Sequence, residues 1–234
     1  PTATGLALRG FDVLGVDVSQ RVVETLKQGK IHIVEPDLDI SVAAAIQSGA
    51  LQVSTTPTPA DAFIIAVPTP LKDGHQPDLA HVESASRAIA PHLAPGNLVI
   101  LESTSPVGTT HKVSEWLASE RPDLKLPHEH PKDAEINVAH CPERVLPGRI
   151  MTELVENDRI IGGISAACTN KAIELYQKFV RGHCLPSDAA TAEMAKLTEN
   201  ASRDVSIAFA NELSIICDQL HIDVWELIAL SNRH

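Results

Sequence analysis

Short runs of apolar residues alternate with longer stretches of mixed polarity along most of the chain. The runs of strand length lie at residues 13–17, 63–67, 97–102, 136–140 and 159–161. Between them apolar positions recur every three or four residues, which predicts helices over residues 19–29, 78–93, 108–119 and 166–180. Residues 1–9 fit the remainder of an earlier helix. This alternation predicts an α/β fold, a parallel sheet with helices on both faces.

The pattern changes near residue 187. Residues 189–220 keep a helical period throughout, which predicts one long helix of roughly 45 Å at about 1.5 Å per residue. Residues 223–231 predict a further short helix. We therefore predict an α/β domain over residues 1–186, followed over residues 187–234 by the start of a helical domain that the long central helix dominates.

Composition narrows the possible functions. The chain of 234 residues has 19 Lys and Arg against 30 Asp and Glu, a net charge of −11. This acidic balance argues against nucleic-acid binding, and no apolar run approaches the roughly 18 residues of a membrane span. The four cysteines are far apart and lack CxxC spacing, so we expect no disulfide framework, no metal site and a cytoplasmic location.

An acidic residue ends the first predicted strand. In a Rossmann sheet, an acid at the end of the second strand binds the adenine-side ribose of NAD, about 20 residues after a GxGxxG turn. Asp17 fits this role, but only 16 residues precede it. The glycine-rich turn would therefore lie at or before Pro1, and we expect the chain to be truncated there. The alternative is that Asp17 only caps the following turn, and the spacing leaves both open.

Two loops rich in proline and hydroxyl groups follow predicted strands. Val67, Pro68 and Thr69 end one strand, and Ser103 and Thr104 end the next. Ligands of such sheets bind at the carboxyl ends of the strands, and small hydroxyls offer hydrogen-bond donors there. Each loop alone is equally consistent with a rigid connection.

Three further polar residues could carry chemistry. Glu143 follows a buried strand and Pro142, where a carboxylate can act as a general base or bind a ligand hydroxyl. Lys196 and Asn200 are four residues apart and share a helix face. A cation and an amide donor directed at one oxygen would stabilise an alkoxide as a hydride leaves. The structural alternatives are a surface acid and a solvated lysine.

Several segments resemble the UDP-glucose/GDP-mannose dehydrogenase family and run through almost the whole chain. They are IHIVEPDL from Ile31, ILESTSPVGTT from Ile100, CPERVLPG from Cys141, DRIIGG from Asp158, AEMAKLTENASRDVSIAFANELS from Ala192 and VWELI from Val224. The resemblance implies a Rossmann domain and NAD-dependent oxidation of a sugar C6 alcohol to a carboxylate. It implies UDP-N-acetyl-D-mannosamine as the substrate and cell-surface polysaccharide synthesis as the pathway.

The resemblance also implies roles for individual residues. For NAD binding these are Asp17, at the ribose, and the nicotinamide-side residues Val67, Pro68, Thr69, Ser103 and Thr104. The implied catalytic residues are Lys196, Asn200, Glu143 and Thr104. The implied substrate-binding residues are Glu143, Arg144, Lys196, Asn200 and Arg203. Arg149 and Arg159 add positive charge that a diphosphate would need, but neither is assigned a role.

The sequence departs from the family at two points. Many relatives have a second glutamate four residues after Glu143, where this chain has Pro147. The family's nucleophilic cysteine lies in a GGxC motif beyond the long helix, which these 234 residues do not contain. Cys184 precedes that helix and is not accepted as a substitute. Because the thiolate would capture an aldehyde intermediate, we expect this chain, truncated at both ends, to be a poor catalyst or none.

Alternative functions remain open at this stage. The chain could belong to an enzyme that oxidises another UDP-sugar, or to a non-catalytic protein that only dimerises. It could also belong to a β-hydroxyacid dehydrogenase, since these enzymes also join a Rossmann domain to a helix with a KxxxN motif. The resemblance implies a homodimer formed through the central helix, with a UDP-sugar as ligand and neither a metal, a nucleic acid nor a membrane as partner. The catalytic interpretation depends on Lys196 and Asn200 facing a cavity shared with Glu143.

Overall fold

The computed structural model describes residues 1–31, 35–146 and 148–233. By their contacts these fall into two compact units, Pro1–Met194 and Ala195–His234. Two details of the sequence analysis lie outside the described residues: part of the segment that begins at Ile31, and Pro147.

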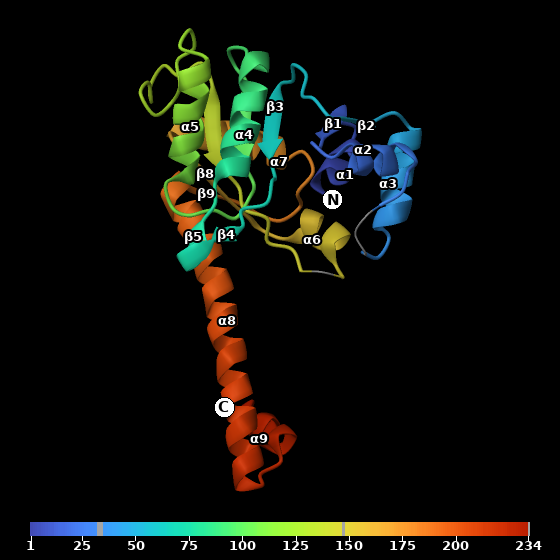
Figure 1. Cartoon of the computed structure of the whole chain (residues 1–234), viewed down its shortest axis with the longest axis vertical. Coiled ribbons are helices and arrows are strands. Elements are labelled where there is room, and N and C mark those ends of the chain that lie inside the picture. The colour runs from blue at the N-terminus through green and yellow to red at the C-terminus, as the bar shows by residue number, and fades with distance from the viewer. Residues whose placement is uncertain (32–34, 147, 234) are drawn as a thin grey trace. The chain divides into compact units, whose positions relative to one another are not determined.

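A five-stranded sheet forms the centre of the first unit (Figure 1). In spatial order its strands are β3 (Ala62–Ile65), β6 (Leu98–Leu101), β7 (Asn137–His140), β8 (Arg159–Gly163) and β9 (Cys184–Asp188). Neighbouring strands pair in parallel, as predicted, except that β7 and β8 are antiparallel. The connection between those two strands contains α6 (Ile150–Glu156) and returns the chain to the same end of the sheet, so β8 runs back against β7.

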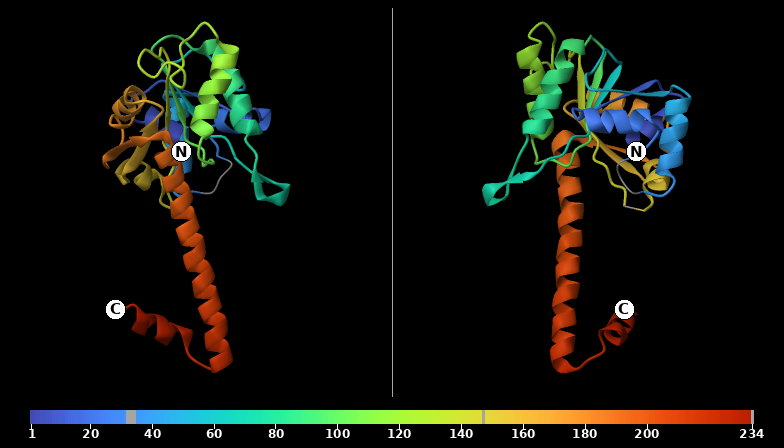
Figure 2. Two further views of the ribbon diagram at one scale, coloured as in Figure 1. Left: turned by 90° about the vertical axis from the view of Figure 1, so that its left-hand side faces the viewer. Right: turned by 45° about the vertical axis from the view of Figure 1, so that its right-hand side comes forward.

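Four further strands form two small sheets. β1 (Val13–Val16) pairs in parallel with β2 (Leu51–Ser54). β4 (Leu71–Lys72) and β5 (Gln76–Pro77) form an antiparallel hairpin, and Figure 2 shows it projecting from the body of the first unit. β1 was predicted from the sequence, whereas β2 and the hairpin were not. The two-residue strands of the hairpin have no period to detect.

Helices cover both faces of the five-stranded sheet (Figure 1). On one face lie α4 (Ala80–Ile89) and α5 (Thr109–Glu120), whose buried residues share a core with β3, β6 and β7. On the other lie α1 (Thr2–Ala7), α6 and α7 (Ala166–Tyr176). The remaining helices of this unit are α2 (Gln20–Lys27), α3 (Leu38–Gln47) and the short 3₁₀ segments Asp73–His75 and Ala90–His92. The predicted arrangement with helices on both faces is confirmed.

Strand β6 explains why the core is continuous across the sheet. All four of its residues are buried, with Val99 and Leu101 facing α4 and α5, and Leu98 and Ile100 facing α7. An unbroken apolar run is typical of a strand covered on both faces. Each such side chain contributes roughly 1.5–3 kcal/mol by its burial.

Two local predictions need correction. The helix expected over residues 19–29 implies Ser19 as its capping residue, and Ser19 does occupy the N-cap position of α2, but its hydroxyl caps no backbone group of a described residue. Instead Asp17 Oδ1 accepts the backbone N–H of Ser19 at 2.8 Å. The strand predicted at residues 63–67 ends at Ile65, because the Val67 carbonyl accepts a side-chain hydrogen bond from Ser103 and Pro68 has no N–H for a ladder.

Helix α8 (Ala189–Leu220) is the long helix that the sequence predicts, and most of it belongs to the second unit. The short helix α9 (Val224–Ser231) follows, and Asp223 caps it by accepting the backbone N–H of Trp225 at 2.8 Å. Across the described part of the chain, no helix is both long enough and apolar enough to cross a membrane.

The beginning of α8 is anchored within the first unit by Glu193, the fifth residue of the helix, which is 1% exposed. Its carboxylate accepts the backbone N–H groups of Gly108 and Thr110 at 2.6 and 2.7 Å, and the Thr110 hydroxyl at 2.6 Å. A negative charge at the start of α5 is favourable because the helix dipole is positive there. The loop from β6 to α5 is thereby fixed at its far end.

Candidate active site

The loops that follow β3 and β6 lie against each other. The Ser103 hydroxyl donates to the Val67 carbonyl at 2.6 Å, and the Thr69 hydroxyl donates to the Thr104 carbonyl at 2.5 Å. Ser103 is buried, whereas Val67, Thr69 and Thr104 keep part of their surface exposed. The structure therefore brings the two predicted nicotinamide-side loops together at the carboxyl ends of neighbouring parallel strands.

Glu143 follows the next strand, β7, and its side chain is 29% exposed. Its Oε1 atom accepts the backbone N–H of Arg144 at 2.8 Å and Nη1 of Arg159 at 3.0 Å. The carboxylate is thus held at one oxygen and still reachable by a ligand.

Arg159 is almost completely buried, at 1% exposure. Nη2 donates to the Leu154 carbonyl at 2.9 Å, and the guanidinium carbon lies 5.9 Å from the centre of the Tyr176 ring. Burial, the largest single effect, would lower the pKa of Arg159, but the nearby acidic groups, with Glu143 first among them, together outweigh it and keep that pKa above its ordinary value. The guanidinium of Arg159 therefore cannot bind the diphosphate of a substrate, because no substrate can reach it.

Glu102, which the sequence analysis did not single out, lies beside this ion pair. It is 5% exposed, accepts the Thr2 hydroxyl at 3.0 Å and accepts the Tyr176 hydroxyl at 3.4 Å. Burial, followed by repulsion from Glu143, raises the pKa of Glu102 to about 7. A glutamate directly after an apolar strand is the signal that could have identified it.

Two further residues at the end of β7 are fully buried. Burial raises the pKa of Cys141 to about 12, so its thiol stays protonated at neutral pH and is a weak nucleophile. Burial lowers the pKa of His140 from 6.5 to about 4, although the backbone of Leu101 offsets part of the effect. Neither ring nitrogen of His140 has a hydrogen-bond partner among the described residues.

All four cysteines have free thiols. Cys184, in β9, is half-buried, and burial raises its pKa above the ordinary value. A thiol with a raised pKa is a weak nucleophile at neutral pH, which agrees with its rejection as the catalytic cysteine.

Asp17 directly follows β1 and is half-buried. The bond from Ser19 to Oδ1 shows that the capping interpretation holds for one carboxylate oxygen. Oδ2 accepts no hydrogen bond from any described residue, so a ribose hydroxyl could still donate to it. The capping and ribose-binding interpretations of Asp17 are therefore compatible.

Arg144 directly follows Glu143 in the sequence. It lines an open depression of about 420 Å³ with Asn157, Asp158, Ile160 and Leu185. Its Nη1 donates to the Asp158 carbonyl at 3.2 Å. Arg144 is half-exposed, so among the arginines near Glu143 it has a guanidinium that a substrate can approach.

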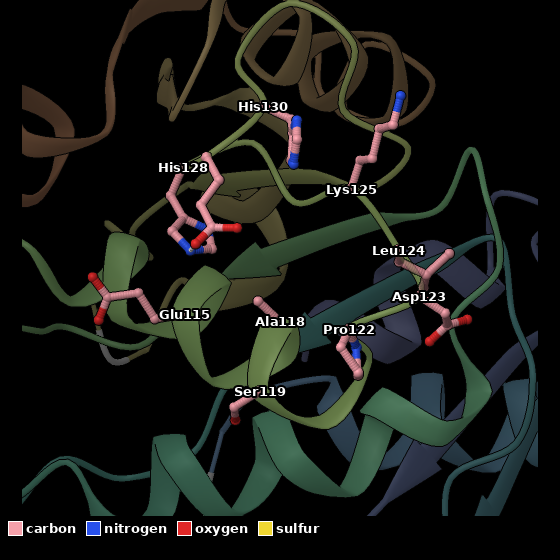
Figure 3. A pocket seen from close by; sticks show the side chains of 10 residues that line it. Glu115, Ala118, Ser119, Pro122, Asp123, Leu124, Lys125, His128 and His130 are labelled. Atoms are coloured by element: carbon pink, nitrogen blue, oxygen red, sulfur yellow. Dashed lines mark ion pairs between the residues drawn. The ribbon is translucent and has the colours of Figure 1, made fainter.

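A larger depression of about 650 Å³ lies elsewhere, between α5 and the loop over residues 121–133 (Figure 3). That loop contains neither a helix nor a strand. His128 faces the depression and shares a 2.7 Å hydrogen bond with Ser114. None of the predicted site residues lines it. Within the described ranges, no three His, Cys, Asp or Glu residues are grouped to hold a metal ion.

The second unit carries the remaining predicted residues. Lys196 and Asn200 lie one turn apart on α8, Lys196 half-buried and Asn200 exposed, and Arg203 follows as an exposed residue. Because they belong to a different unit from Thr104 and Glu143, the cavity expected between the two sets stays a prediction.

Both parts of the chain match one family of known proteins. Residues 1–180 match the NAD binding domain of the UDP-glucose/GDP-mannose dehydrogenase family, and residues 190–234 match its central domain. An NDP-N-acetyl-D-galactosaminuronic acid dehydrogenase of Ralstonia nicotianae is 61% identical over the whole chain. A UDP-N-acetyl-D-mannosamine dehydrogenase of Escherichia coli is 57% identical. The chain spans about half the length of these curated relatives, 55% and 56%.

Solved structures agree with these relatives. A UDP-D-ManNAc dehydrogenase from Pyrococcus horikoshii superposes with a TM-score of 0.93 at 42% identity, over 100% of this chain and 55% of that one. A ternary complex of GDP-mannose dehydrogenase from Pseudomonas aeruginosa gives 0.87 at 25% identity, over 99% of this chain and 53% of that one. The chain therefore belongs to the UDP-glucose/GDP-mannose dehydrogenase family, and its larger part is the family's NAD-binding domain.

Proposed function

We propose that this chain provides the NAD site and part of the sugar site of an enzyme that oxidises UDP-N-acetyl-D-mannosamine at C6 to UDP-N-acetyl-D-mannosaminuronate, for cell-surface polysaccharide synthesis in the cytoplasm. The observation that carries the proposal is the junction of the Val67–Thr69 and Ser103–Thr104 loops at the ends of β3 and β6, next to strand β7, which Glu143 follows, in a chain whose family binds NAD. Family membership argues against a β-hydroxyacid dehydrogenase. The similar relatives are named for two different sugars, N-acetyl-D-mannosamine and N-acetyl-D-galactosaminuronic acid, so the identity of the substrate sugar is part of the proposal.

The residues at the strand ends fit a dinucleotide. Asp17 would offer Oδ2 to the ribose, and Thr69 and Thr104, which keep part of their surface exposed, would contact the nicotinamide side. Bound NAD⁺ would accept the hydride from the sugar. We retain the boundary near residue 186 between the nucleotide domain and the helical domain as a proposal.

The chain's own residues would handle the proton and the developing charge. Oxidation of the alcohol removes a hydride from C6 and a proton from its oxygen, leaving an aldehyde. We assign Lys196 and Asn200 to donate hydrogen bonds to that oxygen, and Glu143 to accept a proton or bind a sugar hydroxyl. Thr104 would lie near the reacting oxygen, and Arg144 and Arg203 would contact the nucleotide sugar.

We propose that the chain alone completes no turnover. Its sequence contains neither a GxGxxG turn for the pyrophosphate nor a GGxC cysteine to hold the aldehyde. Catalytic production of NADH by the purified chain from UDP-N-acetyl-D-mannosamine, at an ordinary enzyme rate, would contradict this part of the proposal.

Calorimetry tests the binding function directly. We expect NAD⁺ to bind, and the Asp17→Ala variant to bind it roughly tenfold more weakly, because one charge-assisted hydrogen bond to the ribose is lost. The matched control is Asp12→Ala, which removes an exposed acid close by in the sequence. Equal weakening by both changes would assign the effect to net charge. A wild-type chain that binds neither NAD⁺ nor any UDP-sugar would support the alternative, a non-catalytic dimerising protein.

The second unit supports the proposal of a homodimer. Apolar residues recur at helical spacing along α8, and most are well exposed: Val205 68%, Phe209 65%, Ile216 40% and Leu220 62%. Soluble monomers rarely expose such a continuous apolar stripe. A second copy of the same helix would cover it with a matching surface.

Sedimentation velocity tests this proposal. The wild-type chain is expected to sediment as a dimer, and Phe209→Glu is expected to weaken the dimer because it places a charge in the stripe. Ile207→Glu is the control, since Ile207 is 54% exposed but lies about 200° around the helix from Val205. A monomeric wild type, or equal dissociation by both variants, would contradict an interface at the stripe.

A further inference from the structure

We propose that Arg159 is a positioning residue that holds one oxygen of Glu143 and thereby presents the other oxygen to the sugar nucleotide. The inference deepens the proposed function and rests on it, because it takes Glu143 as a substrate contact.

The two oxygens of Glu143 have different surroundings. Oε1 accepts Nη1 of Arg159 at 3.0 Å and the backbone N–H of Arg144 at 2.8 Å. Oε2 accepts no hydrogen bond from any residue that the structure describes. Since the side chain is 29% exposed, Oε2 is the oxygen left for a hydroxyl group of a ligand. Two donors on Oε1 also restrict rotation of the carboxylate and therefore fix the direction of Oε2.

Arg159 is itself fixed by the fold. Its guanidinium is 1% exposed, and Nη2 donates to the Leu154 carbonyl at 2.9 Å. Its backbone N–H donates to the His183 carbonyl at 2.8 Å, where β8 begins. Contact with the Tyr176 ring face completes the surroundings. A planar guanidinium can bind Leu154 and Glu143 with two nitrogens at once, which the single ammonium of lysine cannot do in the same geometry.

Stability alone is a weak explanation for this arrangement. Burying a charged pair removes both ions from water, and well-packed apolar residues of similar volume often stabilise a protein as much. Here one ion is buried and its partner is partly exposed at the carboxyl end of the sheet. This asymmetry is expected of an immobile residue that orients a substrate-binding carboxylate. Direct binding of the substrate diphosphate is excluded, because the guanidinium is inaccessible.

A double-mutant cycle tests the proposal on the full chain. Calorimetry measures binding of UDP-N-acetyl-D-mannosamine to the wild type, Arg159→Met, Glu143→Gln and the double variant, below the unfolding temperature of all four. We expect each single change to weaken binding roughly tenfold, as for loss of one hydrogen bond to a charged group. The double variant should bind no more weakly than Glu143→Gln, and Arg159→Lys should recover part of the loss. Arg121→Met is the control, since Arg121 also binds backbone carbonyls and a carboxylate, outside the proposed site.

Three results would overturn the proposal. Losses that multiply in the double variant would show that Arg159 acts independently of Glu143. Wild-type binding by Arg159→Met, or an equal loss in Arg121→Met, would leave Arg159 no specific role. If the wild type binds no UDP-sugar, the proposed function is wrong as well. The free energies of unfolding of the same four proteins in urea then still show whether the effects of changing Arg159 and Glu143 are coupled.

Discussion

Replacing Glu102 with glutamine is expected to stabilise the folded chain at alkaline pH. The pKa of Glu102 is raised from 4.5 to about 7, chiefly by burial. A raised acid pKa stabilises the folded state below pH 4.5, and this contribution is lost as the pH rises to 7 and beyond. Glutamine stays neutral, so the variant should gain about 3 kcal/mol of unfolding free energy over the wild type between pH 4.5 and 8. Urea unfolding at both pH values measures this gain.

The neighbours of Glu102 tolerate the change. The glutamine oxygen can accept one of the hydroxyls of Thr2 and Tyr176, and its amide can donate to the other, so no buried polar atom need lose its partner. Glu174→Gln, at an exposed position on α7, is the control and should show no such pH dependence. A difference between Glu102→Gln and the wild type that does not change with pH would contradict the raised pKa.

Replacing His140 with leucine is expected to protect the chain against acid. The pKa of His140 is lowered from 6.5 to about 4 because the ring is buried. As the pH falls below 6.5 the unfolded chain binds a proton that the folded chain cannot yet bind, so stability falls until about pH 4. Leucine has no such group, and the variant should gain about 3 kcal/mol over the wild type between pH 7 and 4.

The leucine variant should also be no less stable than the wild type at neutral pH. Both ring nitrogens of His140 lack partners among the described residues, and removal of unsatisfied buried polar atoms is neutral or favourable. Stability against urea at pH 7 and 4 measures both effects. His111→Gln, at an exposed position on α5, should change neither. Parallel acid profiles for His140→Leu and the wild type would refute the assignment.

The two groups act in opposite directions in the wild-type chain. Between pH 4.5 and 6.5, acidification stabilises the folded state through Glu102 and destabilises it through His140. Their contributions nearly cancel, so the wild type alone should show little pH dependence from either residue. The single variants are therefore needed to reveal each one.

Much of the fold was predictable because it is periodic. The continuous helical period over residues 189–220 predicts α8 with the observed bounds, and the strand beginning at Val13 and the helix ending near Ser119 are each found within two residues. The antiparallel pairing of β7 and β8 was not predictable, because apolar residues mark burial and carry no sign of strand direction. Helices α3 and α6 were not predicted, because the spacing of apolar residues is less regular in those segments.

The positions of the candidate residues were predictable where a residue follows a strand, and less so where a charged residue is buried; their roles stay predictions. Thr69, Thr104 and Glu143 lie at strand ends, as their positions in the sequence indicate. Glu102 and Arg159 were missed or left without a role, because charged residues are usually exposed. Arg159 binds Glu143, 16 positions away in the sequence, and Glu102 accepts the hydroxyls of Tyr176 and Thr2, 74 and 100 positions away. Only the folded chain shows these contacts.

The carboxylate of Glu193 at the start of α5 has a consequence for anion recognition. Helix amino ends commonly bind phosphate through free backbone donors. Here two of those donors, at Gly108 and Thr110, are already occupied by the protein's own acid. Sulfate or a nucleotide phosphate would have to displace a buried charge to bind there, so protein engineers who want an anion site on this domain would have to remove Glu193 first.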